Sequence, residues 1–149
     1  MTGDLKKQSL LKGLEDSEIE RLIPLISLKK FPADSAIFNE KDPCKGLYLI
    51  ISGKLEISKT TPDGWKQPLV ILDAGSFLGE IALLENSDHA SDARAMEPSE
   101  LFFMPKEIFE EMERKEPAIM LKIIKNIAII TGLNLRRMNE KFLKALVNY

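Results

Sequence analysis

The sequence predicts a mainly β domain, either a barrel or a double-sheet jelly roll, with helices at both ends. In the middle of the chain, short apolar runs alternate with turn residues at intervals of roughly ten residues, which is typical of such folds. Apolar residues at helical spacing come before this region and return after it. A chain of 149 residues suits one compact domain. We therefore expect helices in residues 5–30, strands in residues 31–105 and helices in residues 106–149.

The overall composition is that of an ordinary soluble domain, and it excludes several partners. Hydrophobic residues make up 44% of the chain, and the formal net charge is −2. A surface that binds nucleic acid needs a basic patch, so we expect no nucleic-acid partner. The first residues are polar and do not resemble a signal peptide. The longest apolar runs, such as residues 127–130, are too short to cross a bilayer, so we expect no membrane partner.

Cysteine and histidine each occur only once, and both counts limit the chemistry. Cys44 is the single cysteine and can form no internal disulfide, which favours a reducing compartment and therefore the cytoplasm. His89 is the single histidine. Jelly-roll enzymes that use a metal need two or three histidines and a carboxylate. We therefore expect no metal site and no enzymatic activity.

The amino-terminal region has the pattern of a helix. Ser17 and Glu20 have the spacing of a capping box, in which each side chain bonds to the other residue's backbone amide. The apolar residues that follow recur at helical spacing: Ile19, Leu22, Ile23 and Ile26. Pro24 interrupts this pattern, so the helix is expected to end or bend there.

Six strands are expected between residues 31 and 105. Their ranges are 36–39, 46–51, 54–59, 68–72, 93–96 and 100–104. The breaks between them carry glycine, proline and aspartate, the residues that favour tight turns. An example is the Pro-Asp-Gly run at residues 62–64.

The carboxyl-terminal region predicts a short helix over residues 106–115 and a long one that begins at Pro117 and continues to Val147. One apolar stripe on the long helix falls on heptad positions: Leu121, Ile124, Ala128, Leu135, Met138, Phe142 and Ala145. A second stripe lies on another face: Ile119, Ile123, Ile127 and Ile130. We assign one stripe to the barrel and the other to a second subunit. In the alternative, both stripes pack within one chain. Gly132 could mark a bend.

The segment most suggestive of a binding site is the run Gly-Ser-Phe-Leu-Gly-Glu-Ile-Ala-Leu-Leu at residues 75–84. A glycine turn leads from a strand into a helical turn whose first backbone amides have no helical partner, and such an end favours an anion. Gly79 would let the backbone approach a ligand closely. Glu80 could accept hydrogen bonds from a sugar hydroxyl. The alternative is an ordinary strand-to-helix turn that contains a glycine.

Taken together, these elements resemble the cyclic nucleotide-binding domain family, in particular the sensor domain of the catabolite-activator type. The resemblance covers nearly the whole chain and rests on residues 38–42, the hairpin at 47–57, the Gly-Glu-Ile-Ala-Leu-Leu run at 79–84, and residues 95–101. It implies an eight-stranded jelly roll and a phosphate-binding cassette at residues 77–91. In this cassette, which includes Leu78, the amides of Gly79, Ile81 and Ala82 would hold the phosphate of cAMP or cGMP. Glu80 would hold the ribose 2′-hydroxyl.

The sequence departs from the family pattern at the end of the cassette. There the family has an arginine that pairs with the phosphate, then Ser or Thr, then Ala. Here these positions are His89, Ala90 and Ser91. A charge-assisted hydrogen bond contributes about 1.5–3 kcal/mol, and losing one partner of a buried charged pair costs about 2–5 kcal/mol. Losses of this order would weaken binding about ten- to thousandfold. Two glycines that are common in family turns appear as Asp34 and Lys41, and aspartate tolerates a left-handed backbone better than lysine does.

Two residues could replace the missing arginine. His89 could bind phosphate when protonated, with affinity rising below about pH 6.5. Otherwise His89 is a solvated loop residue. Arg94 could serve if the loop were longer, although this breaks the match that follows and places Arg94 on the opposite strand face.

The resemblance also places Asn134 where catabolite-activator relatives reach the base, unless it is an exposed or seam polar residue. Few residues follow Val147, so we expect no DNA-binding domain. Two functions remain. The first is a sensor that binds a small-molecule nucleotide and relays the signal through the long helix of a homodimer to an unknown protein. The second is a non-binding domain of the same fold that acts in dimerisation or docking.

Overall fold

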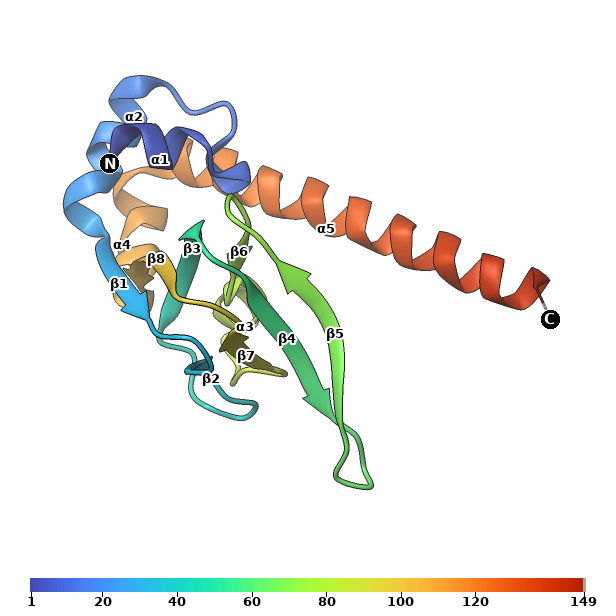
Figure 1. Ribbon diagram of the computed structural model, residues 1–149. Coiled ribbons are helices and arrows are strands. Elements are labelled where there is room, and N and C mark those ends of the chain that lie inside the picture. The colour runs from blue at the N-terminus through green and yellow to red at the C-terminus, as the bar shows by residue number, and fades with distance from the viewer. Residues whose placement is uncertain (149) are drawn as a thin grey trace.

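The computed structural model describes residues 1–148 and has the two layers that the sequence predicts (Figure 1). The helices are α1 (Thr2–Lys6), α2 (Asp16–Leu22), α3 (Glu80–Glu85), α4 (Lys106–Lys115) and α5 (Pro117–Val147), and the 3₁₀ turns are η1 (Ser9–Leu11) and η2 (Ile23–Leu25). The strands are β1 (Ser27–Phe31), β2 (Ala36–Phe38), β3 (Gly46–Ser52), β4 (Leu55–Thr60), β5 (Lys66–Leu72), β6 (Phe77–Leu78), β7 (Asp92–Ala95) and β8 (Ser99–Pro105).

The eight strands form two four-stranded antiparallel sheets, which confirms the eight-stranded jelly roll. The first sheet has the strand order β1-β8-β3-β6, and the second has the order β2-β7-β4-β5. All six predicted strands are present, with ends that differ by up to two residues. The sequence reasoning missed β1 and β6. β1 carries two lysines among its five residues, and β6 has two residues, too few to show alternation.

The predicted capping box of the first long helix is wrong by two positions. Helix α2 is capped by Glu15, whose side chain accepts from the amide of Glu18, and the Glu15 amide donates to the Glu18 carboxylate at 2.9 Å. The same carboxylate accepts from Lys122 of α5 at 2.6 Å. This contact with Lys122, which is distant in the sequence, favours Glu18 over Glu20 as the capping residue. The interruption at Pro24 is present, because η2 replaces the α-helix there.

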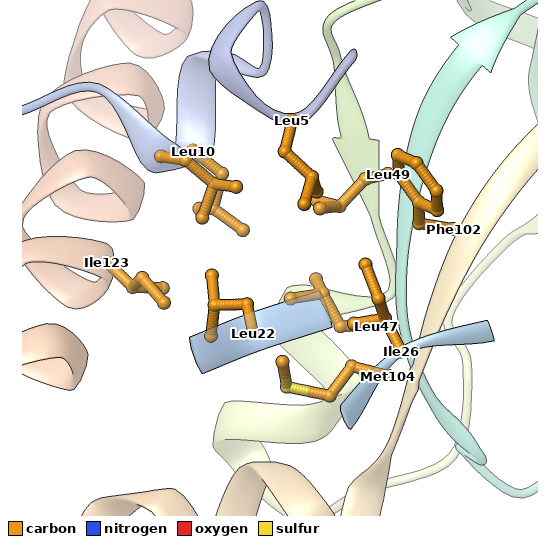
Figure 2. Close-up of a pocket in the computed structure, with 10 residues that line it drawn as sticks. Leu5, Leu10, Leu22, Ile26, Leu47, Leu49, Phe102, Met104 and Ile123 are labelled. Carbon is orange, nitrogen blue, oxygen red and sulfur yellow. The ribbon is translucent and has the colours of Figure 1, made fainter. Parts of the chain in front are cut away.

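Two apolar clusters hold the domain together. One lies between the two sheets: Phe38, Tyr48, Ile50, Leu55, Leu78, Ala93, Ala95, Leu101 and Phe103. The other joins the terminal helices to the first sheet, and it includes Leu10, Leu22, Phe102 and Ile123. A cavity of about 10 Å³ remains in this second cluster, and Figure 2 shows that apolar side chains line it. Its size corresponds to about one water molecule and its lining is apolar, so it is a packing gap and not a ligand site.

Helix α5 is continuous from Pro117, at its first position, through Gly132 to Val147, so no break marks the predicted bend. Its two stripes have different environments. Ile119, Ile123 and Ile127 are buried against the domain. The heptad stripe is largely exposed, with exposed fractions of 56% at Leu121, 57% at Leu135, 66% at Met138 and 64% at Phe142. The alternative in which both stripes pack within one chain is therefore wrong.

By length and composition alone, α5 could also cross a membrane, with a mean hydropathy of 1.6 over its most apolar window. The expectation that no segment is long and apolar enough to cross a bilayer, which was drawn from the short run at residues 127–130, therefore does not hold for α5 as a whole. However, the amino-terminal half of α5 packs on the domain: Asn126 and Lys122 bond to the amino-terminal segment, and Ile123 lies in the core. One face of this half is therefore packed against the domain, and the rest of the helix surface is exposed.

Candidate functional site

The predicted cassette connects the two sheets. Strand β6 pairs with β3 at the edge of the first sheet, with Leu78 opposite Tyr48. The chain then turns at Gly79 into α3 and continues to β7, in the middle of the second sheet. Leu78 is 4% exposed and belongs to the cluster between the sheets. Its side chain therefore contributes to the core at the start of the cassette.

Gly79 is required by the fold itself. Its backbone has φ +90°, a conformation that residues with a side chain rarely adopt. A Cβ atom at this position would lie 2.7 Å from the carbonyl oxygen of Gly46, at the start of β3. The sequence reasoning expected Gly79 to allow close approach to a ligand, but in the structure the close neighbour is β3.

The backbone amides after Gly79 remain available, as the sequence predicts. Within residues 1–148, the amides of Gly79, Ile81 and Ala82 donate to no protein oxygen. The carbonyl of Gly79 accepts from the amide of Leu83 at 3.1 Å, which closes the first helical turn. Ala82 is buried, whereas the Ile81 side chain is 44% exposed. The turn therefore presents unpaired donors at the start of α3.

Glu80 lies at the same turn and has no ion-pair partner among the described residues. Burial raises the pKa of the Glu80 carboxyl, and a bond from its own backbone amide partly offsets this effect. The thiol of Cys44 is nearby, 3.8 Å from the carbonyl oxygen of Gly79. Burial raises the pKa of Cys44, and the charge on Glu80 adds to the increase. A hydroxyl donor from a ligand would supply Glu80 with the partner it lacks.

His89 is packed into the domain. Only 5% of the residue is exposed, and its ring stacks flat on Phe38 with centroids 3.5 Å apart and planes tilted by 1°. Its amide donates to the carbonyl of Asp42 at 2.9 Å, and its carbonyl accepts from the amide of Lys41 at 2.7 Å. The prediction of a solvated loop histidine is therefore wrong.

The environment of His89 also disfavours a cationic ring. Burial lowers the pKa of His89, and the nearby charges of Asp42 and Asp88 oppose this effect only in part. The neutral imidazole is therefore the favoured form at neutral pH. The position that carries the phosphate-binding cation in the family pattern holds an uncharged, stacked ring in this chain.

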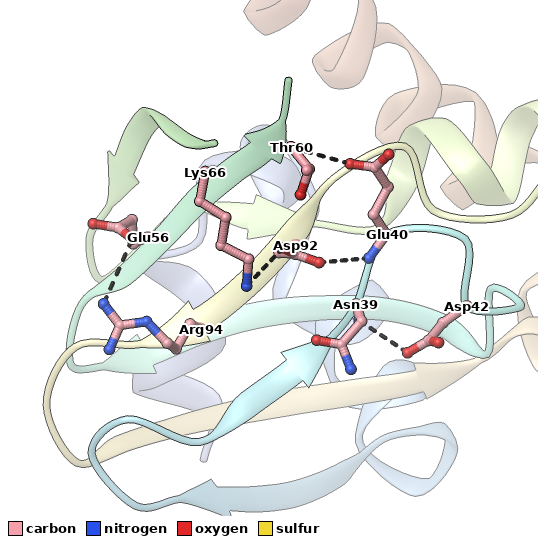
Figure 3. Close-up of polar contacts among 8 residues, drawn as sticks. All are labelled: Asn39, Glu40, Asp42, Glu56, Thr60, Lys66, Asp92 and Arg94. Atoms are coloured by element: carbon pink, nitrogen blue, oxygen red, sulfur yellow. Dashed lines mark hydrogen bonds and ion pairs between the residues drawn. The ribbon is translucent and has the colours of Figure 1, made fainter. Parts of the chain in front are cut away.

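The rest of the cassette carries little positive charge. Ala90 is exposed and Ser91 is half-buried, and no hydrogen bond of the Ser91 hydroxyl occurs within residues 1–148. The next residue, Asp92, is buried and accepts from the Glu40 amide at 2.7 Å and from Lys66 at 3.1 Å (Figure 3). The sequence reasoning missed this network, because it depends on strand register.

Arg94 does not take the place of the missing arginine. It pairs with Asp34 at 2.6 Å and with Glu56 at 3.5 Å (Figure 3 shows the second pair). Its strand neighbours Ala93 and Ala95 are buried between the sheets, so Arg94 points to the opposite, outer face. The alternative that assigned the phosphate to Arg94 is therefore wrong.

Three further residues that the resemblance singles out are Asp34, Lys41 and Asn134. Asp34 and Lys41, which stand where the family often has glycine, both adopt positive φ values, +66° and +74°. Their backbones are therefore held in the left-handed conformation without glycine. Asn134 lies on the exposed part of α5. Its predicted contact with a base stays a prediction.

Ligand chemistry other than hydrogen bonding has little support at this site. Residues 1–148 contain no group of three or more His, Cys, Asp or Glu side chains that could hold a metal ion. A hollow of about 410 Å³ lies at the amino-terminal turns and includes Lys6, Gln8 and Lys12. Within residues 77–91, the cassette offers unpaired amides and the half-buried carboxyl of Glu80 but has no lysine or arginine of its own, and Lys106 of α4 donates to Asn86 at 2.6 Å.

The comparisons with known proteins agree with this geometry. Residues 28–116 match the cyclic nucleotide-binding domain family. A cyclic AMP receptor protein of Thermus thermophilus is 28% identical over 115 residues, which are 77% of this chain and 53% of that protein. Glutaminase 1 of Bradyrhizobium diazoefficiens is 31% identical over 127 residues, which are 85% of this chain and 20% of that protein.

The fold has a similar counterpart among solved structures. A cyclic nucleotide-binding domain from Methylobacillus flagellatus superposes with a TM-score of 0.87 and 17% identity over 95% of this chain and 82% of that one. The chain spans about half the length of the Thermus relative. With the jelly roll, the cassette between its sheets and the family match over most of its length, this chain belongs to the cyclic nucleotide-binding domain family.

Proposed function

We propose that this domain is a regulatory sensor that binds a cyclic nucleotide, cAMP or cGMP, or a related small anion, and relays binding through α5. The observation that carries this proposal is the turn at Gly79, where the amides of Gly79, Ile81 and Ala82 have no acceptor within residues 1–148. Such amides are suited to an anion. Glu80 supplies the acceptor that a ribose hydroxyl needs, and it has no competing cation among the described residues.

A second function is favoured by one observation. The resemblance implies that His89 stands where the family has its arginine, and the His89 ring is buried and stacked on Phe38, with burial lowering its pKa. Without that cation, nucleotide affinity would fall about ten- to thousandfold, below a range useful for sensing. In this second function, the domain binds no nucleotide and acts as a dimerisation or docking module. Neither function includes catalysis.

Calorimetric titration of the purified protein with cAMP and cGMP tests the two functions. The sensor requires measurable heat from the native chain, with modest affinity. The His89→Arg variant should bind about ten- to thousandfold more tightly, because it restores the charged partner. Leu84→Arg is the matched control, since it adds a positive charge at an exposed position of the same cassette, on α3.

Three results separate the two functions. No heat from the native chain at millimolar nucleotide excludes the sensor. Tight binding by the His89→Arg variant alone would mean that the pocket persists and that only the cation was lost. Equal gains in the His89→Arg and Leu84→Arg variants would mean that the added charge acts non-specifically.

We also propose a homodimer formed through the exposed heptad stripe of α5. Leu135, Met138 and Phe142 are each more than half exposed along the part of the helix that projects from the domain (Figure 1). Helices of this kind derive most of their stability from packing an apolar face. A second copy of the stripe would supply that packing in a left-handed coiled coil.

Sedimentation of the native chain and two variants tests this dimer. We expect a dimer for the native chain at micromolar concentration and a monomer for Phe142→Glu, which buries a charge in the seam. Asn139→Glu, one turn away and outside the stripe, should remain a dimer. A native monomer at high micromolar concentration would contradict the proposal.

We also propose a cytoplasmic location, which rests on the single free thiol of Cys44.

A further inference from the structure

A hollow on the surface of the domain lies at the amino-terminal turns. It has a volume of about 410 Å³, and its lining residues lie between Lys6 and Ile19 in the sequence. They come from the end of α1, from η1 and from the start of α2, and Figure 1 shows these helices at the same end of the molecule as the amino terminus. Pockets that bind small molecules have volumes of about 300–1,000 Å³. This amino-terminal hollow is therefore large enough for a small ligand.

Lysine side chains give the amino-terminal hollow a positive charge. Three of its lining residues are lysines, Lys6, Lys7 and Lys12, and one is acidic, Asp16. Lys6 pairs with Asp16 at 2.9 Å, whereas Lys7 and Lys12 form no ion pair within residues 1–148. The formal charge of the whole chain is −2, so the hollow has the opposite sign to the protein. An anion is therefore attracted to this hollow.

Two further carboxylates of this region are held within the structure. The side chain of Glu15 accepts a bond from the amide of Glu18, which caps α2. The carboxylate of Glu18 accepts from Lys122 of α5 at 2.6 Å. Neither glutamate lines the hollow, so their charges do not compete directly with a ligand for Lys7 and Lys12.

The amino-terminal hollow also offers a backbone donor and an apolar wall. Within residues 1–148, the amide of Gly13 donates to no protein oxygen, and a Cβ atom on this residue would meet nothing within 4 Å. Leu11 and Ile19, which also line the hollow, are 4% and 2% exposed, and Leu14 is half-buried. Lysines beside an apolar wall are suited to an anionic group on an apolar body.

Hydrogen bonds fix the wall of the hollow. The carbonyl of Lys12 accepts from the Asn126 side chain at 2.9 Å, and the amide of Ser9 donates to the Gly75 carbonyl at 3.0 Å. Gln8 is 3% exposed, and its side-chain nitrogen donates to a carbonyl of β3 at 2.8 Å. The side-chain oxygen of Gln8 is buried and has no hydrogen-bond partner among residues 1–148. The wall is therefore held in place before a ligand binds, and one of its polar groups is left for another molecule to satisfy.

We propose that the amino-terminal hollow is a second ligand site and that it binds a small molecule with a phosphate monoester on an apolar body. Such a group carries nearly two negative charges at neutral pH, which match the two unpaired lysines. Lys6 can add a third contact by leaving Asp16, because an ion pair between exposed side chains is weak. The site uses no residue of the cassette, so it does not depend on the proposed sensor function.

Titration of the intact chain with phenyl phosphate, followed by the NMR shifts of its backbone amides, tests this site. We expect saturable shifts within residues 6–19, Gly13 included, and none in the cassette. Inorganic phosphate should bind about tenfold more weakly, because it buries no apolar surface against Leu14 and Ile19. Benzyl alcohol carries the ring without the charge, and it should not saturate the site.

Two double variants measure the contribution of the lysines. Lys7→Gln with Lys12→Gln removes both unpaired charges at exposed positions and should weaken binding of phenyl phosphate about tenfold. The affinity of the native chain should fall as salt is added, and the variant should lose most of this dependence. Lys54→Gln with Lys59→Gln is the matched control, because it removes two exposed lysines that likewise form no ion pair within residues 1–148.

The site is contradicted if no amide within residues 6–19 shows a saturable shift at phenyl phosphate concentrations up to about 20 mM. It is also contradicted if inorganic phosphate or benzyl alcohol binds as tightly as phenyl phosphate, or if the two double variants lose the same affinity. Saturable shifts confined to the cassette would place the anion there instead. A chain that binds cAMP at the cassette but no phenyl phosphate at the hollow would keep the sensor function and lose this site, and the opposite result would do the reverse.

Discussion

The two ends of the cassette differ in what holds their residues in place. At the amino end, Gly79 is fixed by its contact with Gly46 of β3, and the amides that follow have no protein acceptor within residues 1–148. At the carboxyl end, His89 is stacked on Phe38 and buried. Gly79 thus meets a requirement of the fold, whereas position 89 is where the family resemblance implies a contact with the ligand. A match to the family at Gly79 therefore says little about binding, and the residue at position 89 says much more.

The largest expected effect tests the fold requirement at Gly79. Gly79→Ala forces a left-handed backbone on a residue with a side chain and places its Cβ 2.7 Å from the Gly46 oxygen. We expect a loss of about 2–5 kcal/mol of unfolding free energy and a fall in Tm of about 5–15 °C. Calorimetric melting measures both quantities.

Gly13→Ala separates the two causes of that loss. Gly13 has nearly the same φ, +88°, but a Cβ there would meet nothing within 4 Å. This variant should lose only the cost of the backbone conformation, about 1–2 kcal/mol. Equal losses in the two variants would mean that contact with β3 does not fix Gly79, and the contrast between the two ends of the cassette would weaken.

A smaller loss of stability is expected when the stack of His89 on Phe38, at the carboxyl end of the cassette, is removed. At pH 7.5, His89→Gln should be less stable than the native chain by about 0.5–1.5 kcal/mol, because the aromatic pair with Phe38 is lost. Because burial lowers the pKa of His89 in the folded state, the unfolded chain binds the proton first as pH falls. The native chain should therefore lose stability below about pH 6.5, its ordinary value, and the difference from His89→Gln should shrink.

Urea unfolding between pH 5 and pH 8 measures this difference. A difference that stays constant with pH would mean that protonation of His89 costs the folded state nothing. The ring would then be able to carry a charge in the folded state, which phosphate binding by His89 requires.

The smallest change in stability is expected at Glu80, because a bond from its own backbone amide offsets part of the pKa increase that burial causes. Its pKa is raised in the folded state, so as pH rises the unfolded chain releases the proton first and the folded chain loses stability above about pH 4.5. Glu80→Gln should therefore be slightly more stable than the native chain at pH 7, and the gain should vanish below pH 4.5. Glu85→Gln, at the exposed end of the same helix, should show no such gain in the same unfolding series.

The fold could largely be predicted because its signals are local. Alternating apolar residues and turn residues marked six strands, and Pro117 marked the start of α5. β1 was missed because its lysines hide the alternation in a strand that pairs on one side only, with β8. The capping box was misplaced because Glu15 and Glu18 have the same spacing as Ser17 and Glu20, and contact with Lys122 of a distant helix favours the first pair.

The site could be predicted only where it is continuous in the sequence. The turn at residues 79–82 has unpaired amides because three consecutive backbone groups start a helix, which a sequence shows directly. The stack of His89 on Phe38 and the pairs of Asp92 with Lys66 and Arg94 with Asp34 join residues that only strand register brings together. A charged residue near a site therefore cannot be assigned to a ligand before its partners within the protein are known.

The part of α5 beyond its last buried residue has a mechanical consequence. About twenty residues follow Ile127 in the helix, a length of about 30 Å. Asn126 bonds the amino-terminal segment at the end of the packed half of α5. If the helix rotates about this point by about 10°, its far end moves by about 5 Å, more than the separation of two touching apolar side chains. A small rotation in the packed half of α5 would therefore become a displacement at its exposed end that is large enough to open or close side-chain contacts there.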